Sequence, residues 1–262
     1  MPVAHVATLR NNVNTAGATL AGSSVTVNAG ETLFVGIATY RAAGTFTFSS
    51  VTWNGLPMTE DKTITIGPGT DIIRTSIFSL YVAAGATAAP QITCSASVDA
   101  STIFVMRSSG GATSSIQDGA GASQTGTSAN PATGTGSAVN TDDFWVAMIG
   151  TDAGAVSNSW TAGSSFTIPT NGAETNGSTN VSSAIEYLAN PGSLTAAASA
   201  TMGGGSATWG AVLMAYKSVS GTGPPPASGD FPQRPEMERP IRAAAFKPMG
   251  DGFRTGKFRS WR

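Results

Sequence analysis

Charged residues are scarce in this chain of 262 residues. Asp, Glu, Lys and Arg make up 11% of it, against about a quarter of an average soluble protein. Leu, Glu and Lys are few, while Ser, Thr, Ala, Gly and Val abound. This composition disfavours coiled coils and helical bundles, whose surfaces need strong helix formers. Hydrophobic residues reach 40%, which is enough for a sizeable core and argues against a wholly disordered chain.

Cysteine and histidine each occur once. Cys94 alone cannot form an intrachain disulfide or a cysteine-based zinc site, and its alternating surroundings, residues 91–96, predict a small buried core residue. His5 is the only histidine, so a Ser-His-Asp triad or a histidine-based metal centre would rest on one residue near a terminus. We therefore predict that the chain is not an enzyme, with no catalytic residue, no metal site and no cofactor.

Long apolar segments that could target or span a membrane are also missing. Residues 1–10 lack a basic segment followed by an apolar run, so no Sec signal peptide is expected. The uncharged stretches 75–98 and 187–216 are broken by Pro, Gly, Ser and Thr, and this pattern indicates strands joined by turns. We expect a protein made in a cytoplasm, without a membrane partner, that would leave a cell by a route other than Sec.

Strand patterns, by contrast, recur through the first 220 residues. Asn54-Gly55 follows the strand-like run 46–53 and supplies the two positive-φ residues of a type I′ turn, which is a strong hairpin signal. No segment has a sustained helical period, so the fold class predicted is all-β, an antiparallel β-sandwich or barrel. The strands expected are 24–27, 33–40, 46–53, 72–82, 91–98, 101–106, 143–151, 181–188 and 207–217.

Two polar segments between these strands are predicted to be surface loops. Residues 108–140 are almost entirely Gly, Ser, Ala and Thr, with one expected strand at 137–139, and residues 171–180 repeat that composition. The adjacent acids Asp142 and Asp143 are interpreted as turn residues, and Asp118 as a loop acid.

The composition changes abruptly at Ser220. We divide the chain into a β-sandwich body at 1–219, a Gly/Pro-rich linker at 220–230 and a C-terminal arm at 231–262. Residues 221–262 hold eight Lys or Arg and four acids, a net charge of +4, which leaves six basic and eleven acidic residues in the rest of the chain, a net charge of −5. The arm has half of the 14 prolines and too few apolar residues for a core of its own.

Aromatic side chains are spaced among the cations of the arm. Such residues anchor interfaces by filling pockets on a partner, while Arg suits the polar rim. We predict a protein-docking arm. The alternatives are a disordered tail and a nucleic-acid-binding tail, and the acids and prolines of the arm weaken the nucleic-acid-binding alternative. The predicted docking residues are Phe231, Phe246, Phe253, Arg254, Lys257, Phe258, Arg259, Trp261 and Arg262.

The sequence contains no complete phosphate-binding motif and only weak signals for other ligands. The glycine-rich stretches 119–136 and 203–206 lack the Lys-Ser/Thr ending of a phosphate-binding loop. Trp53, beside the Asn-Gly turn, and Trp160, in a polar stretch, are candidate glycan contacts, because an exposed indole can stack on a sugar. The alternative for both is packing within the core or a hairpin.

The order of the segments resembles a known module. The runs 31–38, 50–59 (SVTWNGLPMT) and 79–82 are followed by a polar loop, by DFWVA at 143–147 and by ATWGAVLMAYK at 207–217. This pattern, over residues 20–219, is similar to a jelly-roll-like β-sandwich module of phage virion proteins and bacterial surface proteins, in which a VTWNG hairpin and a closing Trp-containing strand recur. The family offers no catalytic residues and has no counterpart of the arm.

The resemblance and the arm together predict a function. We expect a non-enzymatic structural component of a tailed-phage-like virion, a head decoration or tail accessory protein docked through its C-terminal arm. Its partners would be other virion proteins and copies of itself, its location the virion, and lysis would release it. The alternative is a glycan-binding or host-adhesion module that recognises a host-surface glycan.

Overall fold

A computed structural model describes residues 3–11, 17–67, 70–152, 159–163, 165–174 and 181–219. The elements within these residues are β-strands, and their ladders are all antiparallel. The prediction of an all-β antiparallel sandwich is confirmed. The described body stacks three main sheets, whereas a jelly roll has two.

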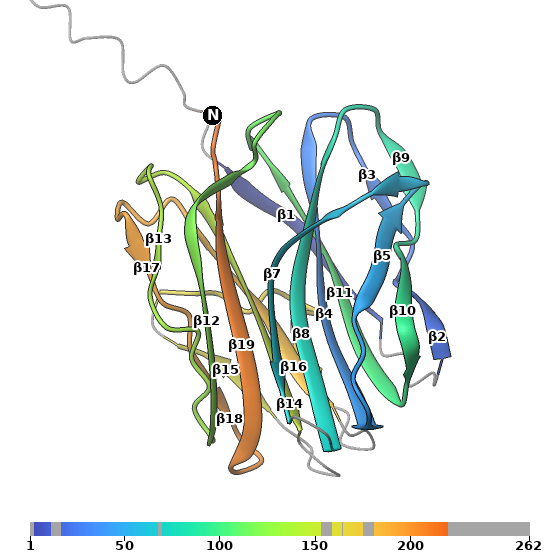
Figure 1. Cartoon of the computed structure of the whole chain (residues 1–262). Helices are drawn as coiled ribbons and strands as arrows, with labels where there is room; N and C mark the ends of the chain where they lie inside the picture. Colours follow the sequence, from blue (N-terminus) through green and yellow to red (C-terminus); the bar gives the residue numbers. More distant parts are fainter. Residues whose placement is uncertain are drawn as a thin grey trace, which may run out of the picture. The chain divides into compact units, whose positions relative to one another are not determined.

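The central sheet is built around β4 (Glu31–Ala43), which lies between β11 (Ala100–Ser109) and β8 (Thr70–Val82). The outer strands are β1 (Ala4–Asn11) beside β11 and β7 (Thr59–Ile66) beside β8. The first ten residues of β4 are buried without interruption. A strand that is apolar on both faces must be covered on both faces, so this sheet forms the middle layer (Figure 1).

One face of the central sheet packs against the β10 sheet. In that sheet β2 (Gly17–Ala21), β10 (Gln91–Val98), β5 (Phe48–Trp53) and β6 (Leu56–Pro57) lie in this order. Leu33, Val35 and Ile37 of β4 meet Trp53 and Ile92 in the shared core. A short pair, β3 (Val25–Val27) and β9 (Ala86–Ala88), adds to this layer.

The predicted hairpin connects β5 and β6. Asn54 and Gly55 have φ angles of 49° and 75°, as a type I′ turn requires, and Trp53 pairs with Leu56. Cys94, on neighbouring β10, is buried, as predicted.

The other face of the central sheet packs against the β19 sheet. Its order is β16 (Ser182–Ala189), β14 (Phe144–Asp152), β19 (Ala207–Tyr216), β12 (Gln117–Ser128), β13 (Gly136–Ser137) and β17 (Thr195–Ala196). A Cβ at Gly36 of β4 would lie 2.9 Å from Met148 Sδ and 3.0 Å from Ile185 Cδ1, so a larger residue there would displace these two side chains. The two sheets therefore approach closely, and Phe34 stacks on Phe144 with ring centres 5.7 Å apart. The pair β15 (Trp160–Ala162) and β18 (Ala200–Met202) packs on Ile149 and Trp209 at the outer face.

The expected loop at 108–140 contains a strand of twelve residues, β12, so this part of the prediction is wrong. β12 pairs with β19 from Ser128 to Gln117, with an irregularity between Asp118 and Ala122. Its small residues allow neighbouring side chains to pack directly against the backbone of β12. A Cβ at Gly126, for example, would lie 2.5 Å from the Trp209 ring. Strands β1 and β7 were likewise not expected. The short strand predicted at 137–139 begins one residue earlier, as β13.

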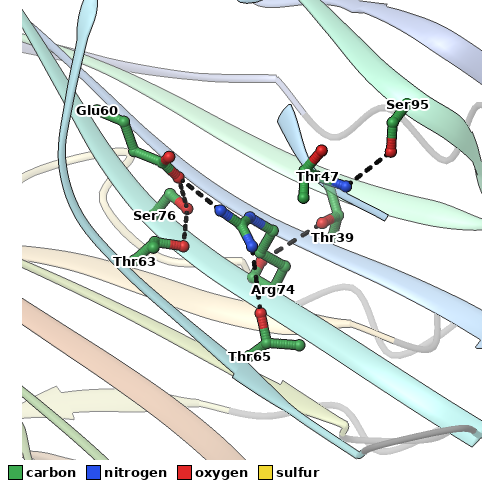
Figure 2. A network of polar contacts seen from close by, with 8 residues as sticks. All are labelled: Thr39, Thr47, Glu60, Thr63, Thr65, Arg74, Ser76 and Ser95. Atoms are coloured by element: carbon green, nitrogen blue, oxygen red, sulfur yellow. Dashed lines mark hydrogen bonds and ion pairs between the residues drawn. The ribbon is translucent and has the colours of Figure 1, made fainter. Parts of the chain in front are cut away.

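A polar network lies on the face of the central sheet turned toward β5 (Figure 2). The Arg74 guanidinium donates to Glu60 at 3.0 Å and to Thr65 at 3.4 Å, and its carbon lies 5.4 Å from the centre of the Phe48 ring. The Ser76 hydroxyl also donates to Glu60, at 3.0 Å. Because these groups are largely satisfied by one another, we interpret the network as structural.

Candidate functional site

The nine predicted docking residues lie outside the described residues. They are Phe231, Phe246, Phe253, Arg254, Lys257, Phe258, Arg259, Trp261 and Arg262. Val219 is the last described residue before the linker and the arm, and the residues around it form the candidate site.

The two candidate glycan contacts have different surroundings. Trp53 is fully buried and its indole N–H donates to the carbonyl oxygen of Ala88 at 3.1 Å, so it has no exposed ring face for a sugar. This structure supports the packing alternative for Trp53. Trp160 is half-buried, and its N–H lies 3.1 Å from the Glu174 carbonyl and 3.0 Å from Ser182 Oγ. Trp53 and Trp160 belong to separate sheets and pack against separate hydrophobic cores, so they do not form one site.

The chain leaves β19 through three residues that are tied to a neighbouring segment. Lys217 donates its backbone N–H to Ile116 at 2.8 Å, and Ala112 donates to the Lys217 carbonyl at 2.9 Å. Val219 donates to Gly110 at 2.7 Å. The root of the arm is therefore fixed to the body up to its last described residue.

A pair of buried carboxyl groups lies directly beside this root. Asp143 precedes β14, and Asp118 lies near the start of β12. Burial, with a hydrogen bond to Asp118 and the charge of that group, raises the pKa of Asp143 to about 8, although the Ser218 backbone acts in the opposite direction. At neutral pH, Asp143 is therefore protonated and shares its proton with Asp118.

Asp118 is the ionised member of the pair. Burial alone would raise its pKa, but hydrogen bonds from Asp143 and from the backbone of Val139 and Asn140 lower it. Val139 N–H donates at 2.8 Å, and Asn140 donates through both its backbone and side-chain nitrogens at 3.0 Å. The interpretation of these acids as turn and loop residues missed the pair, since Asp118 and Asp143 are brought together by the pairing of β12 and β14 with β19.

Exposed apolar side chains occur in the segments that adjoin the same carboxyl pair. Among the described residues, five large hydrophobic side chains are exposed, and three of them, Val139 (71%), Leu194 (47%) and Val219 (45%), belong to this end. Leu194 accepts a hydrogen bond from Ala138, which precedes Val139, and Val219 follows Ser218. We call Val139, Leu194 and Val219 the arm-root surface. Clustered exposed apolar side chains mark interaction sites more often than scattered ones do.

Comparison with known proteins gives no match among protein-family models, curated proteins or solved structures. The resemblance to the phage module therefore rests on the hairpin and closing-strand residues alone. In the described part of the chain, no helix is long and apolar enough to cross a membrane. Within the same residues, no three or more His, Cys, Asp or Glu side chains are grouped as metal ligands would be.

Proposed function

We propose that this chain is a non-enzymatic structural component of a tailed-phage-like virion, a surface β-sandwich that docks through its C-terminal arm. It would serve as a head decoration or tail accessory protein. Its partners would be other virion proteins and copies of itself. The observation that carries the proposal is the arm-root surface, whose exposed apolar residues include Val219, the last described residue before the linker and the basic, aromatic arm.

The organisation of the β19 sheet supports the separation of body and arm. β19 is an interior strand, paired with β14 on one side and β12 on the other along its whole length. Among the described residues β19 is the last strand, and the core clusters contain no described residue beyond Tyr216. The described sandwich thus has an interior closing strand and buried cores without a contribution from residues 221–262, as the proposal requires.

Charge and composition favour a protein partner for the arm. Its net charge of +4 contrasts with −5 for the rest of the chain, so an arm could meet the body of a neighbouring copy or another acidic subunit with complementary charge. Phe246, Phe253, Phe258 and Trp261 would supply the apolar anchors of that contact.

The proposal is tested by deleting residues 221–262 and measuring incorporation into particles. We expect incorporation to be lost while the body retains its far-UV circular dichroism and unfolding midpoint. Normal incorporation of the truncated chain would contradict arm docking.

A second experiment separates anchoring from charge. Phe246→Ala, Phe253→Ala, Phe258→Ala and Trp261→Ala combined should abolish incorporation at any salt concentration. For the arm-root surface, Val139→Ser with Leu194→Ser should weaken incorporation, and Leu56→Ser, which alters an exposed leucine of β6 (46% exposed), is the matched control. Equal effects of the control and the double variant would exclude the arm-root surface as a contact.

A further inference from the structure

A cleft opens between the central sheet and the β19 sheet, away from both tryptophans considered above. Its volume is about 510 Å³, within the range of small-molecule sites. The side chains that line it are uncharged: Thr59, Ser79, Leu80, Tyr81, Thr113, Ser114, Ser115, Ile116 and Gln117. Thr59 and Ser79 are directly paired across β7 and β8, and the last five residues form the segment that enters β12.

The floor of this cleft is organised by a β-bulge at Asp61. The pairing of β7 with β8 shifts between Glu60 and Lys62, so Asp61 is the extra residue, and a bulge redirects a side chain in this way. Tyr216 Oη donates to Asp61 Oδ2 at 2.5 Å, and Gln117 Nε2 donates to Asp61 Oδ1. Burial raises the pKa of Asp61, and these hydrogen bonds, with one from Ser79, act in the opposite direction.

Gln117 links this floor to the cleft. Its amide nitrogen is held by Asp61, which leaves the amide oxygen as a hydrogen-bond acceptor with a fixed orientation. Asp61 itself does not line the cleft, so a ligand would meet the neutral amide and not the carboxylate. Asp61 is thus a positioning residue.

The opposite wall is a loop held at both ends. Ala112 is bonded to the Lys217 carbonyl, and Ile116 accepts from the Lys217 N–H. Between these points Ser115 has a φ of 45°, in the left-handed region that a serine rarely adopts. The backbone that carries Thr113, Ser114 and Ser115 is therefore held beside β8 without a ligand, which lowers the entropic cost of binding one.

We propose that this cleft binds a neutral oligosaccharide, with the half-buried ring of Tyr81 against a sugar face and the surrounding hydroxyls and the Gln117 amide on its hydroxyl groups. The lining has no cation to recognise a phosphate or a carboxylate and no carboxylate to recognise an amine. It has five hydroxyl-bearing Ser and Thr residues besides Tyr81, and their hydroxyl groups would lose their hydrogen bonds to water against a lipid chain. This site does not depend on the virion proposal.

The test is the binding of the full-length chain to an array of neutral hexose and N-acetylhexosamine oligosaccharides, with sialylated and sulfated glycans on the same array. Positive glycans are then titrated by calorimetry. We expect a neutral glycan to bind, with affinity at least tenfold lower for Tyr81→Ala. Ser114→Trp, at an exposed loop position, should fill the cleft and lower affinity similarly without touching the core.

Leu56→Ala, at an exposed position that does not line the cleft, is the control and should leave affinity unchanged within about twofold, whereas Trp160→Ala tests the other candidate glycan contact. Thermal unfolding verifies that each variant folds. The proposal is overturned if no neutral glycan binds, if only anionic glycans bind, or if both Tyr81→Ala and Ser114→Trp bind normally. Loss of binding in Trp160→Ala alone would move the site to that tryptophan. Particle incorporation is measured separately. Failure to bind a glycan therefore does not contradict the docking proposal, and failure of the docking proposal does not contradict the glycan site.

Discussion

Replacing the protonated Asp143 by asparagine tests the carboxyl pair at the arm root. The pKa of Asp143 is raised from 3.8 to about 8 in the folded protein. Between these two values the folded state holds a proton that the unfolded state has released. Stability therefore falls as pH rises from about 4 to about 8, and this loss is absent below that window.

The size of the effect follows from the same two values. A difference of about 4 pH units corresponds to about 5 kcal/mol at 1.36 kcal/mol per unit. Local relaxation and entry of water reduce this, so we expect about 1–3 kcal/mol. Asparagine is neutral at every pH and retains an N–H that can donate to Asp118. Asp143→Asn should therefore be about 1–3 kcal/mol more stable than the natural chain at pH 8.5, and no more than about 1 kcal/mol more stable at pH 5, near the start of the window.

Urea unfolding followed by tryptophan fluorescence at pH 5 and pH 8.5 measures both differences. Asp142→Asn removes the neighbouring, less buried carboxyl and should change stability little at either pH. Burial also raises the pKa of Glu186 to about 8. Because Glu186 is present in both chains, it contributes the same pH dependence of stability to each. Destabilisation of Asp143→Asn by equal amounts at both pH values would refute a protonated Asp143.

Three further predictions concern the cores and the cleft floor. Trp53→Ala should lower the free energy of unfolding by about 3–5 kcal/mol, because a fully buried ring leaves a cavity; a loss below about 1 kcal/mol in urea titration would place Trp53 outside the core. Cys94, whose thiol pKa burial raises to about 11, should react with a chromogenic disulfide reagent at pH 8 only as fast as the body unfolds, and immediate labelling in native buffer would contradict its burial. Tyr216→Phe should cost about 1.5–3 kcal/mol by removing a donor to the half-buried Asp61. Asp61→Asn should restore part of the loss, and additive effects in the double variant would show that the two side chains do not interact.

The parts of the fold that local chemistry determines were predictable from the sequence. Asn54-Gly55 can satisfy its turn without tertiary help, and the apolar run of β4 indicates burial whatever its neighbours are. β12 could not be found in this way because its Gly, Ser, Ala and Thr residues carry no apolar alternation. Its place is set by backbone pairing to β19 and by the room that Gly126 leaves for the Trp209 ring.

The sites depend on contacts that are distant in sequence. Asp61 meets Gln117 56 residues later and Tyr216 155 residues later. The shifted pKa of Asp143 likewise depends on Asp118 and on burial, neither of which shows in the residues adjacent to it. The sequence pattern gives the residue types but not the contacts between residues that are distant in sequence. Neither the cleft nor the carboxyl pair could therefore be predicted from it.

The position of β19 has a consequence for how the protein is made. β14 and β12 are separated in their sheet by a strand that is synthesised after both of them. On the ribosome the central sheet and the β10 sheet can assemble first, because their strands end at Ser109, but the β19 sheet has to wait for Tyr216. Translation of residues 217–262 then gives β19 time to emerge and insert. Insertion of β19 between β14 and β12 is thus the last step in closing the described body.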